Sequence, residues 1–285
     1  DQQLTFSKLS IELIRVLGIE QLNRDILKTL ELYSDQNGFN NAAALLADTN
    51  SFKGIDIIRF GNSINEIMER KSLENISILL QMEQCIQMFH QYYRYEKIEG
   101  MDRKSVDKIP ERDFREAVAN ALVHRMWDIP ASIKISMYSD KIEISSPGGL
   151  PAGISEDEYL NGQISLLRNP IIGNVFFRLK YIEKFGTGIM RINYAYKDAL
   201  IKPDYHIFSN SIQIILPVIK SDYKLNETEK KLLNILKING SMTRNEIEKA
   251  AEIDKSKAIR GLNRLIEKKM IQKRDLGRGT KYEIV

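Results

Sequence analysis

The sequence is poor in residues that build covalent or metal-based frameworks. It contains one cysteine, Cys85, in 285 residues. A single cysteine excludes an internal disulfide and a zinc cluster made of cysteines. The surrounding segment QMEQCIQMF has a helical apolar pattern, so Cys85 is expected to be a helix residue that faces the core. This cysteine usage is typical of a cytoplasmic protein.

Long apolar runs are absent as well. No segment approaches the roughly 20 apolar residues of a membrane span, and the opening DQQLTFSKLS lacks the apolar core of a signal peptide. We therefore expect a soluble, non-exported protein with no membrane partner. There is no low-complexity tract and no internal repeat. The chain begins at Asp1 rather than Met, which leaves open a further N-terminal domain.

Positive charge is concentrated in the C-terminal part of the chain. The net charge of +4 is unremarkable, but residues 222–285 hold 16 Lys and Arg against 10 Asp and Glu. The first 221 residues hold 26 against 28. A basic terminal section is typical of a unit that binds nucleic acid.

The first of three expected sections is a small α/β region over residues 1–100. Helical patterns occur at SIELIRVLG and NRDILKTLELY, a strand pattern at GIDIIRFGNS, and a long helix is predicted from Ser72 to about Tyr95. No candidate chemistry stands out in this section.

The second section, residues 101–219, is predicted to be an α+β layer. A helix rich in Ala, Val and Leu is followed by alternating runs, SIKISMY and KIEIS, that indicate an antiparallel hairpin. Ser155 and Glu158 form a capping-box pattern. Further helices and a second hairpin around YHIFSNSIQIILP close the section.

The third section, residues 222–285, has the pattern of a winged helix-turn-helix. Three helical segments are followed by a β-hairpin, in the order NETEKKLLNILKIN, TRNEIEKAA, DKSKAIRGLNRLIEKKM and IQKRDLGRGTKYEI.

The segment REAVANALVHR places Glu116 and Asn120 one helical turn apart, so both project into one small volume. A carboxylate can orient or deprotonate water, and an amide oxygen suits a magnesium ion that also touches phosphates. Glu111 and Asp113 suit the positive end of the same helix. Taken alone, the pair is weak evidence for a site, because any exposed helix face offers such pairs and a solvated surface is the more common case.

Two glycine elements strengthen the interpretation as a site. Gly148 and Gly149 follow a strand, where a ligand can approach the backbone closely. Gly186 and Gly188 precede a helical pattern whose first amides can face an anion. Each element alone could be a turn or a cap, but their order along the chain is that of a nucleotide pocket.

On these residues the second section resembles the GHKL ATPase superfamily, whose Bergerat-type α/β sandwich is shared by gyrase, MutL and histidine kinases. It is more similar to the divergent ATPase domain named after a RecG-like helicase C-terminus, found in bacterial and archaeal transcriptional regulators. In those regulators the domain follows a Schlafen-type AlbA-like domain, which has no match here. The stretches that carry the resemblance are REAVANALVHR, DKIEISSPGGLP, RNP, FFRLKYIEKFGTGIMRI and IQIILP.

The resemblance implies a role for each matching position. Glu116 would position or activate the attacking water, and Asn120 would ligate Mg²⁺. Gly148 and Gly149 would line the adenine side of bound ATP. The segment 152–185 would form a lid, in which Arg168 either neutralises phosphate charge or caps helix carbonyls. The residues implied around the phosphates are Gly186, Thr187 and Gly188.

Two departures from the family pattern affect what it implies. Where GHKL proteins usually carry an Asp before the first glycine element, this chain has Ser145, Ser146 and Pro147. A serine bonds the adenine amino group only weakly or through water. Close relatives continue HR with Asp-Tyr, whereas this chain has Met126 and Trp127. The helicase name implies no motor, because the phosphate-cradling string G-x-x-x-x-G-K-[ST] is absent.

The third helix of the basic section is the candidate DNA-recognition helix. Its apolar residues fall on one side and its basic residues on the other. The first half of such a helix meets base edges, and a wing tip can enter a minor groove. A solvated basic face is the alternative. The candidate DNA-contacting residues are Ser256, Lys257, Arg260, Asn263, Arg264 and, in the wing, Arg278.

Three functions remain open from the sequence. The first is a cytoplasmic regulator in which ATP and Mg²⁺ control how a homodimer places its winged helices on double-stranded DNA. The second is an ATPase enzyme that its tail recruits to DNA. The third is a nucleotide-free dimerisation or interaction scaffold, which the missing adenine Asp favours.

Overall fold

The computed structural model divides the chain into two compact units, residues 1–219 and 220–285. The structure describes residues 3–162, 166–183, 186–199, 201–219, 225–268, 270–274 and 279–284. Within these ranges no helix is both long and apolar enough to cross a lipid bilayer.

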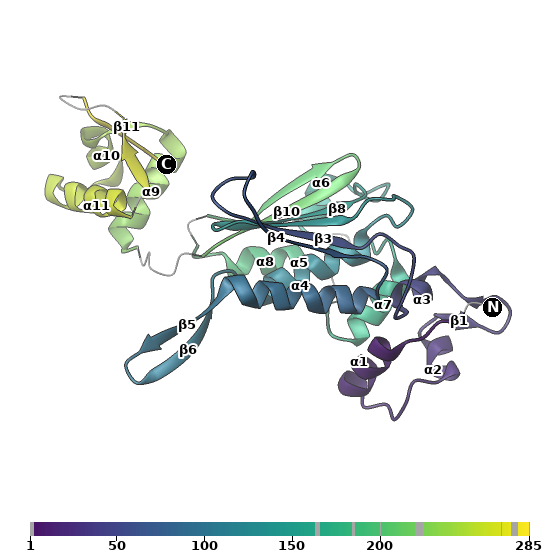
Figure 1. Cartoon of the computed structure of the whole chain (residues 1–285). Coiled ribbons are helices and arrows are strands. Elements are labelled where there is room, and N and C mark those ends of the chain that lie inside the picture. The colour runs from purple at the N-terminus through teal and green to yellow at the C-terminus, as the bar shows by residue number, and fades with distance from the viewer. Residues whose placement is uncertain are drawn as a thin grey trace. The chain divides into compact units, whose positions relative to one another are not determined.

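The first unit is built on a six-stranded mixed sheet (Figure 1). Its strand order is β4-β3-β7-β8-β10-β9, in which only the β3–β7 pair is parallel. The strands are β3 (Ile55–Phe60), β4 (Ile67–Leu73), β7 (Ile133–Met137), β8 (Lys141–Pro147), β9 (Asp204–Phe208) and β10 (Ser211–Pro217).

Helices cover one face of this sheet (Figure 1). The helix α5 buries its apolar stripe, and Phe114, Val118 and Leu122 are fully buried in the core. Alternating residues of β7 and β8 supply the facing surface, since Ile133, Ile135, Met137, Ile142 and Ile144 are all buried. The helices of this layer are α4 (Ile78–Tyr93), α5 (Glu111–His124) and α8 (Gly188–Ala195).

Smaller elements complete the first unit. A two-stranded hairpin, β5–β6, projects from the body (Figure 1). Ser155 caps α6 with Glu158 in the predicted capping box. The elements are α1 (Ser7–Leu17), α2 (Arg24–Thr29), β1 (Tyr33–Ser34), β2 (Gly38–Phe39), α3 (Asn41–Leu46), β5 (Arg94–Glu99), β6 (Asp102–Asp107), α6 (Glu156–Leu160) and α7 (Pro170–Arg178).

The predicted separation at residue 100 does not correspond to a boundary between compact units. Strand β3, from the first section, pairs in parallel with β7 from the second, so one sheet spans both. The predicted helix start at Ser72 is also wrong, because Ser72 lies in β4. Asn75 turns the chain with a positive φ of 60°, and the Ser77 hydroxyl then accepts from Leu79 N at the start of α4.

The second unit has the predicted winged-helix layout. Three helices pack on a small sheet of order β11-β13-β12, around a core that includes Leu232, Leu236, Ile247, Leu262 and Leu265. A side-chain cap begins each of these helices. The elements are α9 (Glu227–Asn239), β11 (Met242–Thr243), α10 (Arg244–Ala251), α11 (Lys255–Glu267), β12 (Ile271–Lys273) and β13 (Lys281–Ile284).

Candidate functional site

Glu116 and Asn120 lie side by side on α5, on the flank that the apolar stripe leaves free. Both are half-buried rather than solvated. Asn120 Nδ2 donates a hydrogen bond to Glu116 Oε1 over 3.2 Å. This bond uses the amide nitrogen and leaves Asn120 Oδ1 as an acceptor beside the carboxylate, so the pair presents two hard oxygen ligands to one space.

The Gly-x-Gly element closes over this pair. Gly188 is the first residue of α8, and a β-carbon at that position would overlap Glu116 Oε1 and lie 2.9 Å from Asn120 Nδ2. Gly186 has a positive φ of 65°. The Thr187 hydroxyl is buried, and no atom of the described residues hydrogen-bonds to it. The structure thus brings together Glu116, Asn120, Gly186, Thr187 and Gly188, which are up to 72 positions apart in the chain.

The setting of Glu116 favours a proton acceptor. Burial raises the pKa of its carboxyl, while the bond from Asn120 and the charges of Arg191 and Arg112 oppose the rise. A carboxylate whose pKa is raised toward neutrality is a better general base than an exposed one.

Asp113, one turn before Glu116, is a residue whose setting the sequence pattern does not reveal. It suits the helix dipole, but it is only 2% exposed, and none of the described residues bonds its Oδ2. Burial raises the pKa of Asp113 to about 7, and the negative charge of Glu116 adds to that rise. Its position at i−3 from Glu116 was the available signal, but only the packing shows that the side chain points inward.

The two glycines of the Gly148–Gly149 turn pack against different neighbours. Gly148 has a φ of 108°, and a β-carbon there would lie 2.5 Å from Arg168 Nη1. Gly149 instead packs against the backbone of the β9–β10 turn, where a β-carbon would overlap the Ser209 carbonyl oxygen. Gly148 therefore lines the candidate site, whereas close backbone packing accounts for Gly149.

Arg168 braces the end of α5. Its Nη1 donates to the His124 carbonyl at 2.8 Å and its Nη2 to the Gly149 carbonyl at 2.7 Å. Next to it, Asn169 Nδ2 donates to the carbonyls of Val123 and Arg125. Of the two expected roles of Arg168, phosphate neutralisation and carbonyl capping, these contacts correspond to capping.

Two neighbouring basic residues are also structural in character. Burial lowers the pKa of His124 to about 4, so its imidazole is neutral at pH 7 and a weak base. Arg125 is 1% exposed, and its guanidinium donates to the carbonyls of Lys53, Gly54, Ile129 and Ala131. It is thus unavailable to a phosphate.

The space beside Asn120 is small in this conformation. The cavity measures about 20 Å³, close to the volume of one water probe. Ser146, at the position of the missing adenine Asp, donates to the Ala121 carbonyl at 2.9 Å. Tyr159 of α6 forms another wall, so the cavity is too small for a nucleotide in this conformation. The cavity is lined by Asn120, Ala121, His124, Ile144, Ser146, Gly148, Tyr159, Ile212 and Ile214.

A metal cage is not present among the described residues, which contain no cluster of three or more His, Cys, Asp or Glu side chains. Any Mg²⁺ at this site would depend on Asn120, the neighbouring carboxylate, water and the ligand's own phosphates. This ligand set is ordinary for Mg²⁺, which keeps several waters and binds few protein groups.

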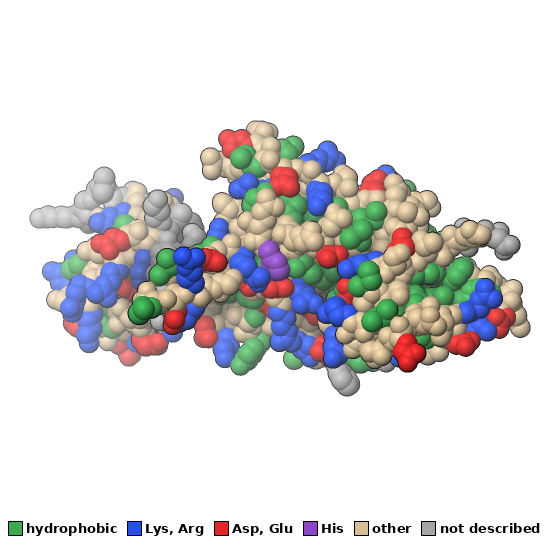
Figure 2. Space-filling model, turned by 60° about the horizontal axis from the view of Figure 1, so that its bottom comes forward, with side chains coloured by type: hydrophobic (Ala, Val, Ile, Leu, Met, Phe, Trp, Pro, Cys, Tyr) green, Lys and Arg blue, Asp and Glu red, His purple; other side chains and the backbone are tan. Residues whose placement is uncertain are grey.

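The candidate DNA-binding face lies on α11. Its core side is buried at Ala258, Leu262 and Leu265, and Gly261 lets the helix approach Leu232 closely. Lys and Arg side chains gather on the second unit in Figure 2. The exposed α11 positions include the candidates Ser256, Lys257, Arg260, Asn263 and Arg264.

These candidates differ in how freely they can reach a ligand. Arg264 Nη1 lies 3.7 Å from the buried carboxylate of Glu229, which also pairs with Lys268 at 2.8 Å. Among the described residues, the hydrogen bond of Arg260 Nε goes to the Ser256 carbonyl of its own helix, at 3.3 Å. Arg260 is therefore freer than Arg264 to contact DNA. Arg278 lies outside the described residues.

Comparison with known families matches both units. Residues 131–216 match the family described as "Putative ATP-dependent DNA helicase recG C-terminal". Residues 219–285 match the family described as sugar-specific transcriptional regulator TrmB. The chain joins a RecG-C-terminal-like domain to a TrmB-type winged helix. This confirms the resemblance and the α+β fold class expected from the sequence.

The TrmB-type winged helix is a DNA-binding domain of a transcriptional-regulator family, and the RecG-C-terminal-like domain belongs to the HATPase-like class. The fold of the chain is similar to that in the crystal structure of the DIP2311 protein from Corynebacterium diphtheriae. That similarity has a TM-score of 0.67 at 17% sequence identity, and covers 100% of this chain but 63% of that one. No curated protein matches the sequence.

Proposed function

We propose that this chain is a DNA-binding transcriptional regulator whose TrmB-type winged helix is coupled to a divergent GHKL-like ATP-binding domain. The observation that carries the proposal is the exposed basic face of α11, presented by a domain of a transcriptional-regulator family. Lys257 and Arg260 lie on the first half of the helix, where a winged helix meets base edges.

The nucleotide part of the proposal is supported by the grouping of Glu116, Asn120 and Gly188. Asn120 Oδ1 would ligate Mg²⁺, and Glu116 would orient water near the terminal phosphate. The first amides of α8 would face the phosphates, because helix N-termini favour anions. When bound, Mg²⁺ supplies charge neutralisation on the phosphate oxygens. Gly148 would border the base.

Coupling would require the nucleotide to bind one arrangement of the lid better than another. The cavity of about 20 Å³ is far below the roughly 300 Å³ of ordinary ligand pockets. Movement of Tyr159 and its neighbours would enlarge it, so ATP would select an open or rearranged lid. In a homodimer this selection would change how two winged helices fit two half-sites.

DNA binding is tested by selecting bound duplexes from a random library at low salt and measuring their affinity by fluorescence anisotropy. We expect selected DNA to bind the intact chain at least tenfold more tightly than unselected DNA. The double variant Lys257→Ala, Arg260→Ala should lose most of this affinity. A control variant on the same unit, Lys237→Ala near the end of α9, should retain it. Absence of any selected sequence would overturn the proposed function.

Nucleotide binding is tested by calorimetric titration of ATP with Mg²⁺. Binding should weaken at least tenfold in Asn120→Ala and remain unchanged in Asn62→Ala, which removes an exposed amide in the β3–β4 turn. Phosphate release that depends on Glu116 would indicate an ATPase enzyme as well. No heat with the unaltered chain, together with an unchanged melting temperature, would leave a DNA-binding scaffold without nucleotide control.

A further inference from the structure

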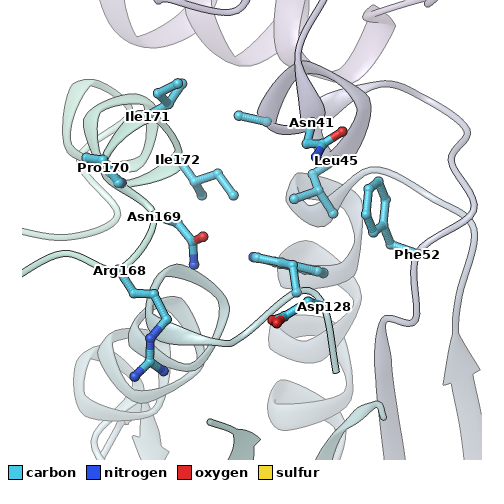
Figure 3. A pocket seen from close by; sticks show the side chains of 11 residues that line it. Asn41, Leu45, Phe52, Asp128, Arg168, Asn169, Pro170, Ile171 and Ile172 are labelled. Atoms are coloured by element: carbon cyan, nitrogen blue, oxygen red, sulfur yellow. The ribbon is translucent and has the colours of Figure 1, made fainter. Parts of the chain in front are cut away.

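A second and larger cavity lies behind the end of α5, outside the candidate nucleotide site. Its volume is about 350 Å³, within the range of small-molecule pockets. In Figure 3, Leu45 and Phe52 stand on one side of the cavity, and Pro170, Ile171 and Ile172 of α7 stand on the other. Of the nucleotide-site candidates, only Arg168 borders it.

Most of the cavity wall is apolar. Ala42 and Leu45 come from α3, and Trp127 meets Phe52 edge-to-face with ring centroids 6.0 Å apart. Leu45 and Ile172 are almost fully buried. Such a wall favours a ligand with an apolar body about the size of a phenyl group or a branched alkyl chain.

Two arginine guanidiniums lie near the cavity. Arg125 lies on the Trp127 ring, 4.3 Å from its centroid, and Arg168 borders the cavity. Within the described residues both guanidiniums bond only carbonyl oxygens and form no ion pair. Arg125 is 1% exposed, so its charge is poorly screened by water. The surrounding field therefore favours an anion.

Hydrogen-bond donors at the cavity wall also favour an anionic ligand. Asn169 precedes α7, but its side chain makes no capping hydrogen bond to the helix, and its Nδ2 donates to the Val123 and Arg125 carbonyls. The first-turn amides at Ile171 and Ile172 thus lack the usual side-chain cap at the cavity wall. The Trp127 indole nitrogen is buried, and no described atom accepts its hydrogen bond. The one carboxylate that lines the cavity is the exposed Asp128.

We propose that this cavity binds a small carboxylate with an apolar body, its carboxylate at the start of α7 and its body between Leu45, Phe52 and Trp127. Two sources share this chemistry, a simple carboxylic acid and an apolar α-amino acid. The carboxylate of Asp128 distinguishes between these two kinds of ligand. Its charge repels a simple acid but attracts the ammonium group of an amino acid.

The occupied cavity would also act on the end of α5. Arg168 and Asn169 line the cavity and hold the carbonyls of residues 123–125 and of Gly149. A ligand that shifts the start of α7 therefore shifts His124 and Gly148, which line the candidate nucleotide site. This last step rests on the proposed function, whereas ligand binding in the cavity does not.

The chain offers a site-specific probe, because Trp127 is its only tryptophan. Titration with 3-phenylpropionate should change Trp127 emission saturably, with a Kd at least tenfold lower than those of the isosteric 3-phenylpropanamide and 3-phenylpropylamine. L-Phenylalanine is the amino-acid probe. Asp128→Asn should tighten binding of 3-phenylpropionate and weaken binding of L-phenylalanine, and the tighter-binding acid in the unaltered chain identifies the source.

Matched variants on α3 locate the binding. Ala42→Phe fills the cavity and should reduce the affinity for the acid at least tenfold, whereas Ala44→Phe, on the same helix but outside the lining, should not. Asn120→Ala should leave acid binding intact even where it removes nucleotide binding. The proposal is overturned if neither acid gives a saturable change, if the amide or amine binds as tightly, or if a folded Ala42→Phe protein binds as before. Thermal melting establishes that this variant is folded.

Discussion

Gly188 packs directly against the side chain of Glu116. The first turn of α8 can therefore lie this close to α5 only because residue 188 has no side chain. The two residues belong to segments that the chain order separates by two hairpin strands and two helices. Their contact places a carboxylate beside a helix N-terminus, where the positive end of the dipole stabilises negative charge. The same end would stabilise a ligand phosphate.

Gly188→Ala should therefore damage both stability and nucleotide binding. The new methyl group has to displace Glu116 and Asn120, and overpacking of this kind costs about 1–3 kcal/mol. We expect a lower denaturation midpoint and at least a tenfold loss of ATP affinity. Gly279→Ala is the control, since a β-carbon at position 279 meets no atom of the described residues within 4 Å. Equal stability and affinity of the two variants would contradict the close packing at Gly188.

Asp113 makes the stability of the first unit depend on pH. Its pKa is raised from 3.8 to about 7, so the folded state holds a proton that the unfolded state releases. The contribution of Asp113 to the free energy of unfolding should therefore fall as pH rises from about 4 to about 7. Asp113→Asn removes this dependence and should stabilise the protein at pH 8 by up to a few kcal/mol, but not at pH 4. Urea denaturation at both pH values measures the difference, and a uniform effect would contradict a titrating Asp113.

Arg125 should be a stability residue rather than a phosphate ligand. Its guanidinium holds four carbonyls from two segments, a geometry that a lysine ammonium cannot reproduce. Arg125→Lys should cost about 3 kcal/mol, because buried carbonyls lose charged donors. Arg178→Lys, at an exposed position of α7, should change the free energy of unfolding by less than about 0.5 kcal/mol. Chemical denaturation of both variants compares them directly.

The two arginines of α11 should differ in the way they affect DNA binding. Arg260→Ala should cost about 1–3 kcal/mol if the side chain reads a base, or reduce the salt slope by about 1 if it contacts a phosphate. Arg264→Ala should weaken DNA binding less and destabilise the second unit, because it removes a partner of the buried Glu229. Affinity measured against salt concentration, together with thermal melting of each variant, separates these effects.

Local pattern predicted most of the fold. Alternation along residues 133–137 and 141–145 predicted the β7–β8 hairpin, and the capping-box pattern of Ser155 and Glu158 located the start of α6. The pattern did not predict the β3–β7 pairing. Parallel strands share no turn, so no local signal joins residue 55 to residue 133. The division at residue 100 followed from treating neighbours in sequence as neighbours in space.

The site shows the same limit. The spacing of Glu116 and Asn120 predicted that they are adjacent, and the structure adds that Gly188 covers them. The sequence did not decide whether Arg168 neutralises a phosphate or caps helix carbonyls, because the carbonyl that it bonds, that of His124, is 44 positions away in the chain. The burial of Asp113 depends on tertiary packing, which helix periodicity alone could not assign.

The parallel pairing of β3 with β7 also limits how this protein can be divided. The segment that matches the RecG-C-terminal family begins at residue 131, so it contains β7 but lacks β3, which pairs with β7, and β4, which pairs with β3. A fragment cut there would expose the backbone of β7 along a row of buried isoleucines, and an open apolar edge recruits strands from other molecules. Expression of residues 131–219 alone would thus yield a self-associating fragment. A fragment that begins before Ile55 keeps β3 and β4, so β7 stays paired on that side.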